Sequence, residues 1–132
     1  KDTPVPEKQA EPEAKEKSTF PKNASGSNVF YEIYDEELYI AVQYTRMLLP
    51  WLGLNAEFSI GIFYLDFGGT GGFVFDIGIL RFFLNAGYDS WAGFVIHPML
   101  GLELGNFILM IESGFGVDSG EIRLGGGAHF AF

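Results

Sequence analysis

The sequence contains no cysteine, and no lysine follows Lys22. Without cysteine, we expect no disulfide, no thiolate metal site and no lipid anchor on an N-terminal cysteine. Long hydrophobic runs are absent too, because no stretch approaches the ~18–20 apolar residues of a transmembrane helix. A basic segment followed by an apolar one is also missing, so no signal peptide is visible and we expect a mature form.

Positive charge is scarce after the first part of the chain. Residues 1–28 carry five lysines and five acidic residues, whereas the rest carries twelve acidic residues and three arginines, Arg46, Arg81 and Arg123. Nucleic-acid binding needs a basic face that neutralises phosphates. The composition therefore excludes a nucleic-acid partner for this domain.

The composition divides the chain into a tail and one domain. Residues 1–24 are rich in Pro, Glu, Lys, Ala and Ser and nearly free of large apolar side chains, so they are predicted to be disordered. Residues 25–132 hold most of the fourteen Phe and eighteen Gly. This mixture disfavours helices, because each Gly weakens a helix by about 1 kcal/mol relative to Ala.

Apolar residues in the domain recur with a period of two. In 53–65, Leu54, Phe58 and Ile60 fall on one face, and Glu57 and Ser59 fall on the other. The segments 92–104 and 122–132 repeat the pattern, which is typical of strands. Turn signals, among them Gly68 to Gly71, then divide the domain into about eight strands. These are expected at 25–34, 38–48, 52–66, 72–80, 82–89, 92–104, 106–117 and 121–132, with a break near Leu80-Arg81 that has no turn residue.

The contents of the two faces favour a membrane barrel. One face is apolar, and the other is mostly Gly, Ala and Ser with single charges, which suits the crowded interior of an eight-stranded barrel. A lipid-facing surface excludes Lys, and Arg46 and Arg81 fall at predicted strand ends, where a membrane interface tolerates them. Aromatic residues near the strand ends suit interfacial girdles: Tyr31, Tyr34, Tyr44, Trp51, Tyr64, Tyr88 and Trp91.

These features predict an all-β fold, an antiparallel up-and-down transmembrane β-barrel. The alternative fold is a soluble β-sandwich or a lipocalin-like carrier of hydrophobic ligands, whose apolar face would point inward.

The end of the chain resembles the C-terminal β-signal of bacterial outer-membrane proteins. Its last residue is Phe132, preceded at alternate positions by Phe130, Ala128 and Leu124, with Gly126 as a weak member. The length and pattern of 25–132 are similar to small OmpA/OmpX/OmpW-type barrels. The resemblance implies recognition by the barrel-assembly machinery and a place in the outer membrane of a double-membraned, Gram-negative bacterium. If the number of strands is even, both termini are periplasmic, and the turns near 35–37, 67–72, 89–91 and 117–120 are extracellular.

The inward-facing polar residues are the candidate functional site. We expect Arg123 to pair with one or two carboxylates in a structural network, since buried charges are costly unless paired. A proton or cation path is the alternative. The predicted interior network consists of Glu57, Asp76, Asn85, His97, Glu103, Glu112, Arg123 and His129.

No catalytic, metal or cofactor site is predicted. His97, His129 and a Glu lack a recognisable metal-ligand spacing, and neither histidine has an adjacent Ser. An outer-membrane lipid hydrolase or acyltransferase is the enzymatic alternative. The predicted turn tips with Asp66, Asp89, Asp118 and Glu121 are expected to be solvated, and binding of divalent cations or lipopolysaccharide-bound ions is the alternative.

The sequence thus predicts a non-enzymatic outer-membrane protein with a filled interior and a structural or complex-subunit role. The alternatives are a narrow, porin-like cation-selective channel and the soluble carrier. Expected partners are outer-membrane lipid and lipopolysaccharide, the assembly machinery, and a protein partner in an envelope complex.

Overall fold

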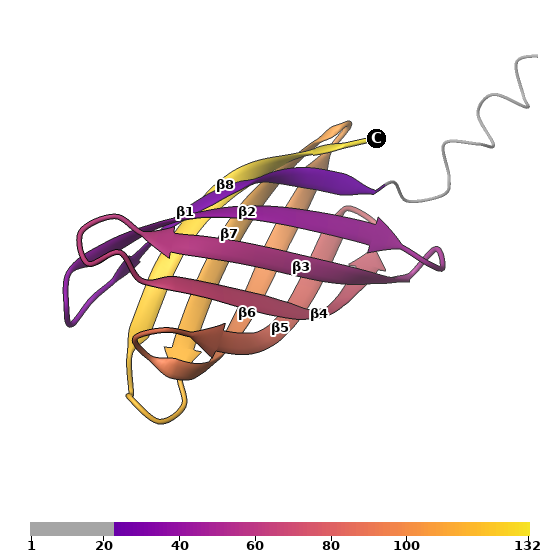
Figure 1. Ribbon diagram of the computed structural model, residues 1–132. Coiled ribbons are helices and arrows are strands. Elements are labelled where there is room, and N and C mark those ends of the chain that lie inside the picture. The colour runs from indigo at the N-terminus through magenta and orange to yellow at the C-terminus, as the bar shows by residue number, and fades with distance from the viewer. Residues whose placement is uncertain (1–22) are drawn as a thin grey trace, which may run out of the picture.

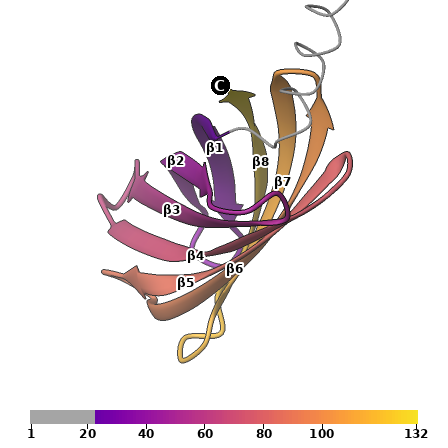
Figure 2. The same cartoon turned by 90° about the vertical axis from the view of Figure 1, so that its right-hand side faces the viewer.

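A computed structural model describes residues 23–132 of the protein. Residues 1–22, which make up most of the expected tail, lie outside the described residues. The described chain forms eight strands, β1 (Ala24–Glu32), β2 (Glu37–Met47), β3 (Leu52–Gly61), β4 (Phe67–Ile77), β5 (Leu80–Asp89), β6 (Gly93–Leu104), β7 (Phe107–Gly116) and β8 (Ile122–Ala131). Each strand pairs antiparallel with the next, and β8 pairs with β1, so the sheet closes into a barrel (Figures 1 and 2). The predicted all-β, up-and-down barrel of eight strands is confirmed.

The barrel has two ends, which differ in their turns. The terminal end is where β1 begins and β8 ends (Figure 1), and it also carries the turns at 48–51, 78–79 and 105–106. The far end carries the turns at 33–36, 62–66, 90–92 and 117–121. No helix in the described part of the chain is long and apolar enough to cross a membrane.

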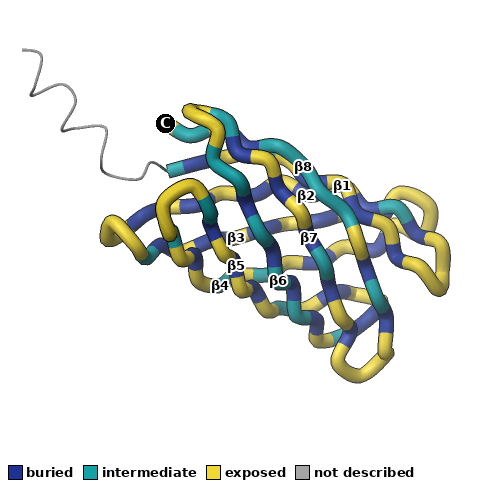
Figure 3. The backbone as a smooth tube through the Cα atoms, turned by 180° about the vertical axis from the view of Figure 1, so that it is seen from behind, coloured by how far each residue is buried: buried dark blue, intermediate teal, exposed yellow. Residues whose placement is uncertain are grey.

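Buried and exposed residues alternate along the strands (Figure 3), as the period of two predicts. Successive side chains therefore point to opposite sides of the barrel wall. The outward positions of the eight strands are occupied by apolar, Gly, Ala and Ser residues, and Arg46 is the one charged side chain among them. The inward positions carry the buried polar and charged residues. The lipocalin-like alternative requires the opposite arrangement, with the apolar face inside.

The stagger of the strands makes the barrel narrow. The stagger is measured by going from each residue to its paired residue on the next strand until the path returns to the first strand. A path that starts at Gly101 of β6 returns to β6 at Gly93, eight residues away. It passes through Met110, Gly127, Asn28, Ala41, Ser59, Gly68 and Asp89. Eight strands with a shear of about 8 give a barrel whose interior is filled by side chains rather than left as a pore.

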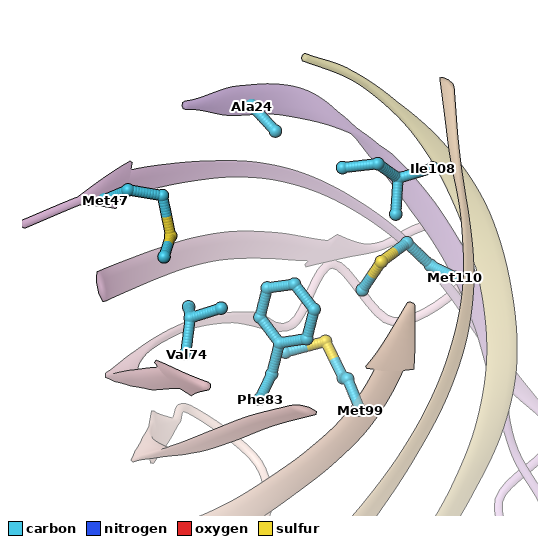
Figure 4. Close-up of a cluster of buried hydrophobic side chains, with 7 residues drawn as sticks. All are labelled: Ala24, Met47, Val74, Phe83, Met99, Ile108 and Met110. Atoms are coloured by element: carbon cyan, nitrogen blue, oxygen red, sulfur yellow. The ribbon is translucent and has the colours of Figure 1, made fainter. Parts of the chain in front are cut away.

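An apolar cluster packs inside the barrel toward its terminal end. Its members point inward from β1, β2 and β4 to β7 (Figure 4) and include all three methionines, whose unbranched side chains fill irregular spaces. The cluster consists of Ala24, Met47, Val74, Phe83, Met99, Ile108 and Met110. We call this cluster the apolar plug.

Two predicted turns are wrong. Gly68 to Gly71 lie within β4, and the chain reverses at 62–66 instead, where Leu65 has a φ of 59°. The carboxylate of Glu37 accepts hydrogen bonds from the backbone N–H groups of Phe63 and Tyr64 at 2.8 and 2.7 Å, and so holds this apolar turn. The break expected near Leu80-Arg81 is instead a turn at 78–79, where Gly78 has a φ of 73°.

A proline interrupts the pairing of β6 with β7. The two strands pair at Val95 and Ile96 and again from Met99, with no pairs at His97 and Pro98. Proline has no backbone N–H to donate. The hydroxyl of Ser113 on β7 donates to the carbonyl oxygen of Pro98 at 3.2 Å. This hydrogen bond links the two strands where their backbone pairing is interrupted.

Candidate functional site

All eight residues of the predicted interior network lie at inward positions of the strands. Asp76 and Glu103 are half-buried, and the other six are buried. Six of them belong to three separate charged clusters along the barrel, and Asn85 and His129 lie beside one of these clusters. We call these the far cluster around Arg123, the middle cluster around His97 and the terminal cluster around Arg81.

Arg123 is the centre of the far cluster. Its guanidinium group lies 2.9 Å from the Glu121 carboxylate and 3.3 Å from that of Asp89, and Arg123 is 1% exposed. The same group lies over the Tyr39 ring, 4.3 Å from its centroid, and donates to the Tyr39 hydroxyl oxygen at 3.2 Å. The Tyr39 hydroxyl in turn donates to Asp66 at 2.8 Å. The predicted pairing of Arg123 with two carboxylates is found, but with residues that the sequence placed in solvated turns.

Acidic side chains at the far end hold the turns through backbone N–H groups. Besides Glu37, Glu32 accepts from the N–H groups of Tyr34 and Asp35 at 3.1 and 2.6 Å. Asp89 accepts from those of Trp91 and Ala92, both at 2.9 Å. Hydrogen bonds from backbone N–H groups stabilise a carboxylate. The excess of acids at this end therefore has a structural explanation.

Two carboxyl groups in the far-end turns have perturbed acidities. Burial raises the pKa of the Asp66 carboxyl, and the carboxylate of Asp89 raises it further, whereas the Tyr39 hydrogen bond opposes the rise. Burial likewise raises the pKa of the Glu121 carboxyl, against the opposing effect of Arg123. Both groups therefore favour the protonated form more than a solvated carboxyl does.

The middle cluster joins His97 to two glutamates inside the barrel. His97 Nδ1 lies 2.8 Å from Glu112 Oε2 and 3.3 Å from Glu57 Oε1. Asn28 donates to Glu57 at 3.0 Å and to Gln43 at 2.7 Å, which extends the polar contacts across the barrel. The side chains of His97 and both glutamates are at most 2% exposed.

Glycines make room for the side chains of the middle cluster. A Cβ atom at position 114 would lie 2.9 Å from His97 Nε2, so the imidazole packs directly on Gly114. A Cβ at position 127 would overlap the Asn28 side chain. His129 Nε2 lies 3.1 Å from Asn28 Oδ1, and Asn85 donates to the Thr70 hydroxyl oxygen at 3.2 Å, so these two predicted residues sit beside the cluster rather than in it.

Arg81 lies in the barrel interior and not at the membrane interface, where its place at a predicted strand end put it. It is 1% exposed, and its Nε lies 3.0 Å from Asp76 and 2.6 Å from Glu103. Arg81 was missed because β5 was expected to begin at 82. Its position has the same parity as Asn85 and Asp89, so the alternation of β5 carries the signal that places it inside.

The expected assembly-signal residues share the outer face of β8. Leu124, Phe130 and Phe132 are exposed on that face, Ala128 is half-buried there, and the Phe130 ring packs on Phe107 with centroids 5.5 Å apart. The Phe132 backbone N–H donates to the carbonyl oxygen of Asn23 at 2.8 Å, which joins the end of the described chain to its beginning.

The fold and its interior define a class of structure, a closed eight-stranded barrel with an apolar outer wall and a packed, charged interior. No protein-family model matches the chain, and no curated protein sequence matches it. Similar solved structures share this fold. A designed transmembrane β-barrel has a TM-score of 0.66 and 16% identity, with 85% of this chain and 97% of that chain covered.

Two further structures are similar. The Yersinia pestis outer membrane protein Ail, solved in a phospholipid bilayer nanodisc, has a TM-score of 0.63 and 15% identity, with 85% of this chain and 99% of that chain covered. The designed protein TMB2.3 has a TM-score of 0.60 and 15% identity, with 86% and 96% covered. The chain therefore has the fold of small transmembrane β-barrels.

Proposed function

We propose that the protein is an integral outer-membrane β-barrel of a double-membraned bacterium, with a filled, non-conducting interior and a structural or complex-subunit role. The outer wall carries the proposal, since Arg46 is the one charged side chain at the outward positions of the described strands. A wall of this composition is suited to lipid, where a charged side chain near the midplane costs about 2–4 kcal/mol. The fold that the chain shares with Ail supports the outer membrane as its location.

The interior supports a structural role rather than conduction. The apolar plug packs inside the barrel toward the terminal end. At the far end, the acidic side chains pair with Arg123 or accept hydrogen bonds from backbone N–H groups of the turns. A non-enzymatic role is part of the proposal, in which the two histidines serve the interior network through their contacts with Glu57, Glu112 and Asn28.

Orientation and assembly are part of the same proposal. The terminal end faces the periplasm, and the far-end turns face outward toward lipopolysaccharide. The assembly machinery recognises β8 through Phe132 and the apolar positions before it. Removal of Phe132 should reduce assembly in the outer membrane of a bacterial host, while removal of Lys1 should not.

Planar-bilayer conductance of the refolded full chain tests the proposed function. The intact protein should insert and show no discrete current steps, because the plug leaves no continuous polar path. Heat-dependent gel migration verifies that the inserted protein is folded. Cation-selective steps that Glu103→Gln abolishes would replace this proposal with the narrow channel.

A further inference from the structure

The three charged clusters differ in how their carboxylates are compensated. At the far end the carboxylates are held by Arg123 and by backbone N–H groups. In the terminal cluster, Arg81 pairs with both acids, and the Glu103 side chain retains 22% exposure. In the middle cluster, two carboxylates that are each 1% exposed share one imidazole. The middle cluster is therefore the one whose negative charge is least compensated.

Polar atoms of the middle cluster also lack hydrogen-bond partners. Glu57 is satisfied by Asn28 and His97, but Glu112 Oε1 and His97 Nε2 are buried without a partner. A buried polar atom without a partner costs roughly 1–3 kcal/mol. Glu112 Oε1 belongs to one of the two carboxyl groups of the cluster, so the cluster has a buried acceptor to which no N–H or O–H group donates.

The charges of the middle cluster match a divalent cation. With both carboxyl groups ionised, the cluster carries one negative charge beside an imidazolium and two beside a neutral imidazole. A divalent ion bound to the neutral imidazole and both carboxylates makes the cluster neutral. A proton on one carboxyl group beside an imidazolium is the other neutral arrangement, and a divalent ion would displace that proton. Neutrality matters here because an uncompensated buried charge costs several kcal/mol.

The geometry of the three side chains is close to that of a metal site. Glu57, His97 and Glu112 each offer one ligand atom, and these atoms all lie within 4.8 Å of one another. Tetrahedral Zn²⁺ with bonds of ~2.0–2.1 Å separates its ligand atoms by about 3.3 Å. The observed separations from His97 Nδ1 are 3.3 Å to Glu57 Oε1 and 2.8 Å to Glu112 Oε2, so the first already fits and the second must lengthen by a few tenths of an ångström.

We propose that Glu57, His97 and Glu112 bind a divalent transition-metal ion inside the barrel. One imidazole nitrogen and carboxylate oxygens form a ligand set that suits Zn²⁺, and Glu112 Oε1 is available as a further donor. The hydrogen bond from Asn28 orients Glu57, and Gly114 leaves space for the His97 ring, as supporting contacts do around metal ligands. The site is formed by the interior alone and does not depend on the membrane location proposed above.

Cobalt titration of the refolded full chain in detergent micelles tests the site. The protein is stripped with a chelator, and Co²⁺ is added either during refolding or afterwards. The intact protein should bind one equivalent of Co²⁺ with visible absorption bands typical of a four-coordinate site, and Zn²⁺ should displace the cobalt. His97→Gln should abolish these bands, whereas the matched variant His129→Gln should retain them.

A second readout keeps the test decisive if a variant folds poorly. Zn²⁺ should raise the thermal midpoint of the intact protein and of the control Glu103→Gln, but not that of Glu112→Gln, because an ion that binds only the folded state stabilises it. Binding in either loading protocol, with this dependence on His97 and Glu112, supports the site. Absence of saturable binding in both protocols overturns it, as does equal binding by His97→Gln.

Discussion

Arg123 and Arg46 carry the same charge but face opposite sides of the barrel wall. Arg123 is 1% exposed between the carboxylates of Glu121 and Asp89, whereas Arg46 lies outside on β2. Removal of one partner from a buried ion pair leaves an uncompensated charge. The two arginines therefore offer a matched comparison of interior and exterior charge.

We expect Arg123→Met to lower the free energy of unfolding by about 3–5 kcal/mol, because Asp89 and Glu121 lose their cation. Arg46→Met should change it by less than about 1 kcal/mol, since the side chain lies near an interface. Urea-induced unfolding of the refolded proteins in lipid vesicles measures both. Equal effects of the two substitutions would contradict the assignment of Arg123 to a buried cluster.

Asp66 links the stability of the far end to pH. Burial raises the pKa of its carboxyl in the folded state above the ordinary value of 3.8. The folded protein then binds a proton at a pH where the unfolded chain does not, so protonation favours folding. The stabilisation of the folded state by this proton is fully present at a pH below the ordinary pKa of 3.8. It is lost as the pH rises through the raised pKa of the folded state.

The unfolding free energy of the intact protein should therefore rise as the pH falls from neutral toward the ordinary carboxyl range. Asp66→Asn removes this titration, so the variant should be less pH-dependent and more stable than the intact protein at neutral pH. Urea unfolding at a series of pH values measures the difference between the two proteins. A difference that does not change with pH would show that Asp66 is solvated.

Interior residues could be predicted where the alternation of a strand was clear. All eight members of the predicted network face inward, because the parity of each strand was correctly identified from its apolar residues. Which of them make contact could not be predicted, since contacts depend on the stagger between strands. Tyr39 of β2 and Asp89 of β5 meet Arg123 of β8 across the barrel interior, because the stagger brings these inward side chains to the same level at the far end. Asp66 joins them through the Tyr39 hydroxyl.

Turns were predicted less well than strands. The glycines at 68–71 suggested a turn because Gly often ends strands. In the barrel, the inward Gly68 instead packs against Asp89, while Gly69 and Gly71 lie on the outer face. The real turn at 62–66 depends on Glu37, which is distant in sequence, so no local signal identifies it.

The glycines of β8 allow the barrel to close on β1. A Cβ atom at position 125 would overlap the backbone of Val29 and the Phe30 side chain. We expect Gly125→Ala to destabilise the protein by about 1–3 kcal/mol through overpacking. Gly71→Ala is the matched control, because its nearest neighbour, the Asn55 carbonyl oxygen, would lie at an ordinary 3.5 Å.

Urea unfolding of the two glycine variants measures the effect, and gel migration of unheated samples reports whether the barrel closes. Gly71→Ala should match the intact protein in both assays. A Gly125→Ala variant as stable as the intact protein would contradict the close approach of β8 to β1.

The whole molecule combines an apolar wall with a charged interior that one end seals. The wall follows from the sequence, because the outward parity of every strand avoids charge except at Arg46. The apolar plug did not follow from the sequence, since its seven residues come from six strands and meet only after the barrel closes. Once the barrel has closed, the apolar plug separates the polar middle cluster from the terminal end.

The two tryptophans lie in turns at opposite ends of the barrel, Trp51 at the terminal end and Trp91 at the far end. Trp91 donates to Asp35 at 2.9 Å and stacks on Tyr64, with ring centroids 6.4 Å apart. Such aromatic residues mark the two interfaces of a membrane barrel. Their fluorescence therefore reports directly on whether the wall between them is covered by lipid.

Quenching by brominated lipids is the measurement that tests the central claim. In vesicles, Trp51→Phe and Trp91→Phe should each leave one tryptophan that bromine near the headgroups quenches most. Phe58→Trp, made on the outer wall in a background without the other two tryptophans, should be quenched most by bromine deep in the acyl chains. A folded protein that stays monomeric in detergent-free buffer and shows no quenching at any of the three positions would contradict a membrane-spanning barrel.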